Sequence, residues 1–264
     1  MTLPSGHFST KTGDFRPTLF TGYRARVADF HVETIGSGPK VVLVHGSVGN
    51  GRATWEGVRT LADRFELAIV DRPGYPPNEP LPRIDFEEQA RQIAGLVGPD
   101  VHLVGHSYGG VISMLAAAQA QVRSLVVNEP PAFGVARGHP AVDEFLRAME
   151  GAPATPREYL EYFLPLVGSN LTIPDPLPQA LDRGARAALV ERPPHQAAIP
   201  LAELAAAPFP KLVVSGAHSA AFDAVADVLE RRLGAERAVV PGAGHSIPRA
   251  PGYADTLAAF LEAA

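Results

Sequence analysis

Short runs of consecutive apolar residues recur along the chain, and longer segments with helical periodicity lie between them. The runs fall at residues 40–44, 67–70, 101–104, 124–127, 211–215 and 238–240. Continuous apolar runs of this length are typical of strands that are buried on both faces of a parallel sheet. Helical patterns cover residues 55–64, 85–96, 220–233 and 253–263. This alternation predicts an α/β fold with a mostly parallel central sheet and helices on both faces.

The alternation of strands and helices stops between residues 133 and 207. This segment is predicted to be helical, with proline breaks between helices at residues 142–149, 156–167, 177–190 and 201–206. We therefore expect a helical cap, residues 133–207, inserted into a core made of residues 19–132 and 208–264. Residues 1–18 have no periodicity, which predicts an irregular N-terminal arm. Alternating polarity at residues 24–35 predicts an antiparallel strand or the arm of a hairpin.

Composition and charge restrict the partners. The chain has 264 residues, a net charge of -5 and no cysteine. The negative charge argues against nucleic acid or an anionic membrane as the main partner. We find no signal-peptide pattern and no apolar run of membrane-spanning length, so the expectation is a cytoplasmic protein that acts on a small molecule. The oligomeric state stays open.

The stretch Gly105-His106-Ser107-Tyr108-Gly109-Gly110 lies between an apolar strand run and a helix rich in alanine and leucine. In this context G-x-S-x-G is typical of a tight strand-to-helix turn that raises the serine hydroxyl above the edge of a sheet. Glycines are needed on both sides because a Cβ would collide with the neighbouring strand or helix. We predict that Ser107 is a nucleophile, in preference to an ordinary serine at a helix N-cap.

Two other loops at predicted strand ends carry candidate chemistry. His45-Gly46-Ser47 opens a glycine-rich loop that lacks both the ending of a P-loop and the glycine spacing of a dinucleotide site, so no nucleotide cofactor is expected. Gly242-Ala243-Gly244-His245 follows the last apolar run, and core packing explains a loop histidine between small residues poorly. No histidine pair has metal-binding spacing with a carboxylate, so we predict no metal site.

Together these three motifs resemble those of α/β-hydrolases, and the likeness covers nearly the whole chain from about residue 24, including the helical cap. The resemblance implies a serine nucleophile, a histidine base and an acid in the order Ser…Asp/Glu…His. Ser107 would attack, and His245 would take its proton and pass it to the leaving group. The backbone N–H groups of Ser47 and Tyr108 would form the oxyanion hole.

The acid departs from the family pattern. Most α/β-hydrolases resemble one another in a Gly-x-x-Asp after the strand that matches residues 211–215, but here the sequence is Gly216-Ala217-His218-Ser219. Glu129, at the end of the preceding strand, resembles the acid of haloalkane dehalogenases and zearalenone-type lactonases. Asp223, one turn into the next helix, is the alternative, and the absence of a working acid is a third possibility. We favour Glu129 because a helix turn is a poor starting point for reaching the histidine loop.

The predicted function is hydrolysis of an ester or lactone of a small, fairly hydrophobic molecule through an acyl-enzyme. A cap predicts an apolar pocket beneath it. Because fold does not fix chemistry, hydrolysis of a C–C bond, amide or thioester, a non-hydrolytic lyase or cyclase, and a ligand-binding protein with weakened turnover stay open. The candidate aromatic residues for the pocket lining are Trp55, Phe133, Tyr159, Tyr162 and Phe163.

Overall fold

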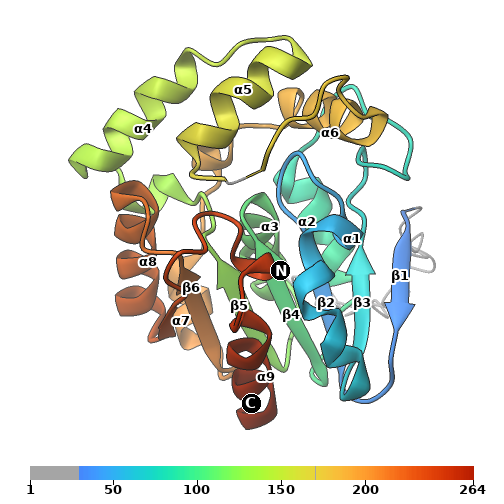
Figure 1. Cartoon of the computed structure of the whole chain (residues 1–264). Helices are drawn as coiled ribbons and strands as arrows, with labels where there is room; N and C mark the ends of the chain where they lie inside the picture. The colour runs from blue at the N-terminus through green and yellow to red at the C-terminus, as the bar shows by residue number, and fades with distance from the viewer. Residues whose placement is uncertain (1–29, 170) are drawn as a thin grey trace, which may run out of the picture.

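A seven-stranded sheet with the strand order β1-β3-β2-β4-β5-β6-β7 forms the centre of the molecule (Figure 1). The computed structural model describes residues 30–169 and 171–264. Strand β1 pairs with β3 in the antiparallel direction, and the other neighbouring strands pair in parallel. The prediction of a mostly parallel sheet in an α/β fold is confirmed.

Each predicted apolar run lies in or overlaps one strand. The bounds are β1 (Val32–Ile35), β2 (Lys40–Val44), β3 (Glu66–Val70), β4 (Val101–His106), β5 (Ser124–Asn128), β6 (Lys211–Ser215) and β7 (Glu236–Val239). Strand β7 begins before the predicted run because its polar first residues lie at the exposed edge of the sheet. The arm predicted at residues 1–18 lies outside the described residues, as does the first part of the strand predicted at residues 24–35.

Helices flank the sheet and cover one of its ends. Their bounds are α1 (Gly51–Trp55), α2 (Phe86–Ala94), α3 (Tyr108–Ala117), α4 (Pro140–Glu150), α5 (Pro156–Leu166), α6 (Gln179–Leu189), α7 (Leu201–Ala206), α8 (Ala220–Leu233) and α9 (Tyr253–Ala263). The helix expected at residues 55–64 is instead α1 followed by a 3₁₀-helix, Glu56–Asp63. Its residues Val58 and Leu61 are both buried, because a 3₁₀-helix aligns positions three apart on one face.

Alternate residues of the central strands belong to two cores on opposite faces of the sheet. Val42 and Leu103 pack on the side of α2, α3 and α8. Val41 and Val104 pack on the other side, against the 3₁₀-helix after α1 and against α9. Successive side chains of a strand point to opposite faces, so burial of both faces requires the continuous apolar runs seen in the sequence.

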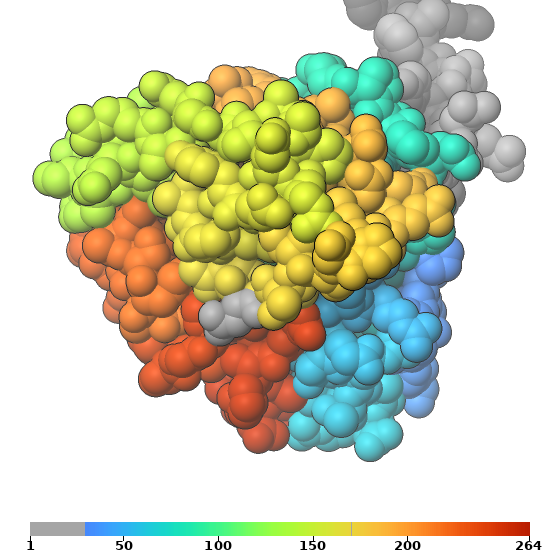
Figure 2. Space-filling view, turned by 45° about the horizontal axis from the view of Figure 1, so that its top comes forward, coloured from blue at the N-terminus to red at the C-terminus, as the bar shows by residue number. Residues whose placement is uncertain are grey.

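Helices α4, α5 and α6 extend over the carboxyl ends of the strands, and Figure 2 shows them together on that face, coloured yellow-green to gold. These helices and α7 lie between β5 and β6 in the chain, in the segment for which we predicted a cap. Helix α6 rests directly on the loop after β2: a Cβ added to Gly184 would lie 1.7 Å from the carbonyl oxygen of Val48. None of the helices in the described ranges has the length and apolarity needed to cross a membrane.

Candidate active site

Ser107 occupies a strained turn between β4 and α3. Its φ is 53° and its ψ is -126°, a conformation that costs a residue with a Cβ on the order of 1–3 kcal/mol. The turn tolerates no side chain nearby: a Cβ on Gly105 would lie 2.5 Å from the Gly109 carbonyl oxygen, and one on Gly109 would lie 2.3 Å from that of Val44. The Ser107 N–H donates to the Asn128 carbonyl oxygen at 2.8 Å. The neighbouring strands thus hold the serine at the carboxyl edge of the sheet.

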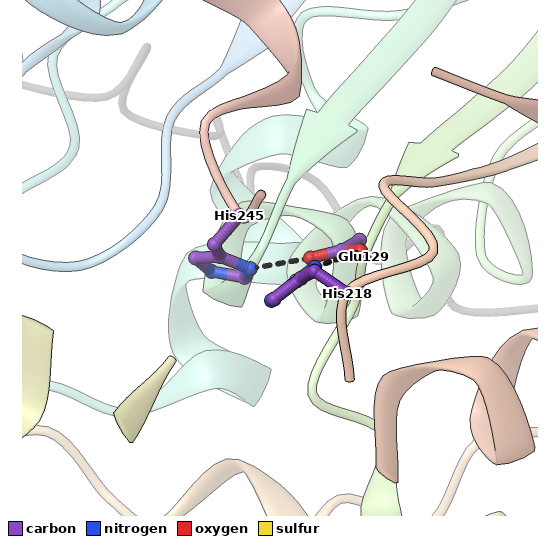
Figure 3. Close-up of side chains that lie close together, drawn as sticks. All are labelled: Glu129, His218 and His245. Carbon is purple, nitrogen blue, oxygen red and sulfur yellow. Dashed lines mark hydrogen bonds and ion pairs between the residues drawn. The ribbon is translucent and has the colours of Figure 1, made fainter. Parts of the chain in front are cut away.

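His245 connects this serine to a buried carboxylate. Its Nε2 lies 2.9 Å from the Ser107 Oγ, and its Nδ1 lies 2.8 Å from the Glu129 Oε2 (Figure 3 shows the second contact). When Nδ1 carries the proton and donates it to the carboxylate, Nε2 can accept the serine proton. His106 Nε2 is 2.7 Å from the His245 carbonyl oxygen, so the histidine beside the nucleophile braces the loop that carries His245.

Glu129 is 1% exposed and directly follows β5. Its Oε1 accepts a hydrogen bond from the Gly216 N–H at 2.7 Å and lies 3.2 Å from His218 Nδ1, an ion-pair distance. Burial by itself would raise the pKa of Glu129, but the hydrogen bonds from His218 and His245 outweigh it and lower the pKa to about 2. The carboxylate is therefore ionised near neutral pH and can hold the imidazole of His245 in one tautomer.

Sequence reasoning missed His218, which lies next to Glu129 and faces the carboxylate oxygen that His245 does not contact (Figure 3). Its Nδ1 faces Glu129, and its Nε2 is 2.9 Å from the carbonyl oxygen of Val167. Both partners can only accept hydrogen bonds, so the imidazolium form, with a proton on each ring nitrogen, fits this position best. The hydrogen bond to Glu129 raises the pKa of His218, in agreement with this charge. The sequence contains a hint of this, because His218 directly precedes Ser219, the position that matches the acid of most family members.

Asp223, the alternative acid, lies on α8 and pairs with Arg237 at 3.4 Å. Within the described ranges, it is not among the side chains that hydrogen-bond to His245. Its carboxylate faces Arg237 of β7 instead. Ser219 is at the N-cap of α8, but its hydroxyl makes no capping hydrogen bond.

The loop after β2 brings Ser47 next to the nucleophile. A Cβ on Gly46 would lie 2.7 Å from the Cβ of Ser107, so the Gly46–Ser47 peptide lies against the serine. For neither Ser47 nor Tyr108 does the described part of the chain contain a hydrogen-bond acceptor for the backbone N–H. Both N–H groups therefore remain able to donate to an oxyanion formed at a substrate carbonyl.

Two cavities meet at Ser107, and both have Ser47, Phe163 and Val167 in their walls. The first, of about 430 Å³, lies between Ser107 and helices α4, α5 and α6, which together with the segment up to β6 we call the cap. The second, of about 360 Å³, extends past His245. The remaining walls are mainly apolar. Those of the first include Tyr108, Phe133, Phe145, Tyr159 and Phe222, and those of the second include Leu164, Leu181 and Pro248.

Three of the five predicted pocket aromatics, Phe133, Tyr159 and Phe163, line the first cavity. The prediction is wrong for Trp55, which is fully buried in the core on the α9 side of the sheet. It is also wrong for Tyr162, whose hydroxyl donates to the Ala148 carbonyl oxygen at 2.6 Å and ties α5 to α4. Phe163 is four residues after Tyr159 and stacks on it, whereas Tyr162 points toward the neighbouring helix.

Glu129, His218 and His245 offer three potential metal-ligand atoms within 4.8 Å of one another, the one such group in residues 30–169 and 171–264. Both Nδ1 atoms already face the carboxylate, so a cation would have to displace these hydrogen bonds. The absence of a metal or cofactor stays a prediction.

The fold and the site together define a class of protein: a mostly parallel sheet with a serine at a strand-to-helix turn, followed along the chain by a carboxylate and a histidine. A model of the Alpha/beta hydrolase family matches residues 41–259. The chain belongs to this family.

Curated relatives and solved structures agree with this assignment. The chain is 32% identical over 171 residues to a pimeloyl-[acyl-carrier protein] methyl ester esterase of Methylococcus capsulatus, a match that covers 62% of this chain and 65% of that protein. A protein of the same name from Chromobacterium violaceum is 37% identical over 105 residues, covering 39% of this chain and 41% of that protein. The structure of an α/β hydrolase from Sphaerobacter thermophilus superposes with a TM-score of 0.63 at 24% identity, covering 88% of this chain and 96% of that one. The sequence match thus spans less than two thirds of the length of these curated relatives. The structural superposition spans most of both chains.

Proposed function

We propose that the protein is a carboxylic ester hydrolase in which Ser107 is the nucleophile, His245 the general base and Glu129 the acid that orients it. The observation that carries the proposal is the unbroken chain of contacts from Ser107 Oγ to His245 Nε2 at 2.9 Å and from His245 Nδ1 to Glu129 Oε2 at 2.8 Å. Such a chain activates a serine hydroxyl that is otherwise a weak nucleophile. The named esterases among the curated relatives add support.

In the proposed reaction, Ser107 Oγ attacks the ester carbonyl carbon while its proton moves to His245 Nε2. The carbonyl electron pair moves to the oxygen, which accepts hydrogen bonds from the N–H groups of Ser47 and Tyr108. Collapse of this intermediate breaks the C–O bond, and His245 protonates the leaving alkoxide. Water then attacks the acyl-enzyme by the same steps, which releases the acid and restores Ser107.

The two cavities support an open-chain ester over a small lactone. His245 lines the second cavity and must protonate the leaving alcohol, so we assign the alcohol to that side. The cavity under the cap then takes the acyl group, and its aromatic walls favour an uncharged, fairly hydrophobic chain. In a small lactone the acyl and alcohol parts are joined in one ring, which uses the two cavities less well.

Hydrolysis of p-nitrophenyl acetate, butyrate and octanoate, followed by the methyl esters of the same acids, tests the proposal. We expect turnover of all three p-nitrophenyl esters, with the highest kcat/KM for butyrate or octanoate. Ser107→Ala is the control and should lower kcat by roughly four to six orders of magnitude, because members of a triad act as a unit. A folded parent protein with no turnover above this variant would contradict ester hydrolysis.

A further inference from the structure

A buried ion pair that the proposed mechanism does not use lies directly behind the oxyanion hole. Arg72, from the loop after β3, is fully buried, and the side chain of Glu191, from the cap segment after α6, is 7% exposed. Arg72 Nη2 and Glu191 Oε1 are 2.5 Å apart, and the Tyr75 hydroxyl donates to the same carboxylate oxygen at 2.9 Å. A buried pair is expensive to desolvate, so its position next to the site calls for an explanation.

The pair holds both sides of the Gly46–Ser47 peptide. The Gly46 carbonyl oxygen accepts hydrogen bonds from Arg72 Nη2 at 3.1 Å and from His45 Nδ1 at 2.7 Å, and the Ser47 hydroxyl donates to Glu191 Oε2 at 2.5 Å. In a trans peptide the C=O and N–H bonds point in opposite directions. Fixing the Gly46 carbonyl therefore aims the Ser47 N–H, the proposed oxyanion donor, away from Arg72 and toward the substrate side.

His45 is suited to this role because it stays neutral. Burial and the nearby Arg72 charge hold the pKa of His45 well below its usual value. The neutral ring donates through Nδ1 to Gly46, and its Nε2 accepts from the Arg72 backbone N–H at 3.0 Å. Both ring nitrogens are thereby satisfied, and these two contacts restrain the loop.

The other oxyanion residue is connected to the same elements. The Arg72 guanidinium lies 4.8 Å from the centre of the Tyr108 ring, and the Tyr108 hydroxyl donates to the Arg192 carbonyl oxygen at 3.0 Å. Two consecutive cap residues, Glu191 and Arg192, thus bind the side chains of the two oxyanion residues. Ile84 fixes this segment on the core: its N–H donates to Val190 O at 2.9 Å, and its carbonyl oxygen accepts from the Arg192 N–H at 2.8 Å.

We propose that the cap segment Glu191–Arg192, acting through Arg72, positions the oxyanion hole, so that seating of the cap determines how well the transition state is stabilised. These three are positioning residues: their hydrogen bonds go to the Ser47 hydroxyl, the Gly46 carbonyl and the Tyr108 hydroxyl, although Glu191 also lines the first cavity. The inference rests on the proposed function and deepens it. It links specificity to rate, since a substrate that disturbs the cap also disturbs the oxyanion donors.

The test compares Ser47→Ala, Ser47→Thr and Glu191→Gln with the parent enzyme. The Ser47 N–H is retained in all three variants, but Ser47→Ala loses the hydroxyl that binds Glu191, and Glu191→Gln loses the charge that holds Arg72. Loss of an oxyanion donor costs about 10²–10³ in kcat, so we expect a misaimed donor to cost about 10- to 100-fold, with KM within about threefold. Ser47→Thr restores the hydroxyl and should recover most of the activity.

A readout that a merely structural role would not change is the affinity for phenylboronic acid, which forms a tetrahedral adduct with an active serine. We expect its inhibition constant to rise in Ser47→Ala and Glu191→Gln by a factor close to the fall in kcat. Fluorophosphonate titration counts the active sites, so that kcat is given per active enzyme. Tyr108→Phe, which loses only the bond to Arg192, gives a third measurement should Glu191→Gln fail to fold.

The matched control is Arg183→Met. Arg183, on α6, donates to the Asn78 carbonyl oxygen at 2.7 Å and so joins cap to core without contacting an oxyanion residue. Its kcat should stay within twofold of the parent. This inference alone is overturned if the parent is active and Ser47→Ala, Tyr108→Phe and Glu191→Gln keep its kcat and boronate affinity. It is also overturned if Arg183→Met loses as much activity as those variants do. A parent without ester turnover or boronate binding overturns the proposed function as well.

Discussion

At the scale of single residues, Glu129 and the two histidines that contact it, His218 and His245, determine how Ser107 would be activated. The φ of Glu129 is 43°, in the left-handed region that is rare for a residue with a Cβ, and its N–H donates to the Val214 carbonyl oxygen at 2.9 Å. The turn that follows β5 thus points the carboxylate at the histidine loop. Strain at this position and at Ser107 marks two of the three proposed catalytic residues.

Replacement of this acid by its amide should abolish most of the activity. Glu129→Gln keeps the shape of the side chain but favours the unproductive tautomer of His245, so we expect kcat to fall by about 10³- to 10⁴-fold. Asp223→Asn is the control and should stay within about fivefold, because Asp223 pairs with Arg237 instead. Steady-state kinetics with p-nitrophenyl butyrate distinguishes the two, and the opposite ranking would move the acid to Asp223.

The His218–Glu129 contact should make stability depend on pH in a defined direction. The folded-state pKa of His218 is raised above its usual value of 6.5, so its contribution is complete below about pH 6.5 and declines as pH rises through the folded pKa. We therefore expect the difference in Tm between the parent and His218→Gln to be larger at pH 6 than at pH 9. Thermal unfolding across this range measures it. A difference that is constant or grows with pH would contradict an imidazolium at this position.

Sequence reasoning reached the residues whose position follows from local pattern, and missed those brought together by the fold. Ser107 and His245 lie in recognisable motifs, and Glu129 was found because it ends an apolar strand. His218 contacts Glu129, which is 89 residues earlier in the sequence, and Arg72 contacts Glu191, which is 119 residues later. No periodicity or spacing connects residues so far apart, so the second histidine and the buried ion pair emerged only from the packed structure.

At the scale of elements, the turn between β4 and α3 depends on close approach of backbones. Gly109 lies against β2, where an added Cβ would meet the carbonyl oxygens of Val44 at 2.3 Å and His45 at 2.4 Å. Backbone atoms inside a sheet cannot yield as a flexible side chain can. This explains why a pattern of glycines predicts the turn so well.

A methyl group at this glycine should therefore destabilise the protein. We expect Gly109→Ala to lower the free energy of unfolding by about 1–3 kcal/mol, the range typical of overpacking. Gly98→Ala is the matched control, because a Cβ added there has no neighbour within 4 Å in the described structure. Urea denaturation followed by circular dichroism compares them, and equal stabilities would show that the turn is not closely packed.

Helix α5 presents Tyr159 and Phe163 to the cavity under the cap, while Tyr162 binds α4. Phe163→Ala should enlarge this cavity and shift the ratio of kcat/KM for octanoate over butyrate toward the longer ester by about threefold or more. Tyr162→Phe removes only the bond between helices, so its ratio should equal that of the parent even where Tm falls. Assays with both p-nitrophenyl esters decide this. Equal ratios in all three proteins would place the acyl chain elsewhere.

At the scale of the whole molecule, the parallel sheet brings distant parts of the chain to one edge. The loops after β2, β4 and β5 carry the proposed oxyanion peptide, nucleophile and acid, and the loop after β7 carries the proposed base, His245. The alternation of strands and helices predicted this architecture because it requires all parallel strands to end on the same side. It could not predict where the cap segment touches the core, since the contacts of Glu191 and Arg192 depend on tertiary packing.

The most direct test is the mass of the intact protein after treatment with a fluorophosphonate, followed by peptide mapping. The probe reacts with an activated serine whatever the natural substrate is. We expect one adduct per chain, located on Ser107, a much slower reaction in Glu129→Gln, and no adduct in Ser107→Ala. An unmodified parent protein, or an adduct on a different residue, would contradict the assignment of Ser107 as the nucleophile of this α/β-hydrolase.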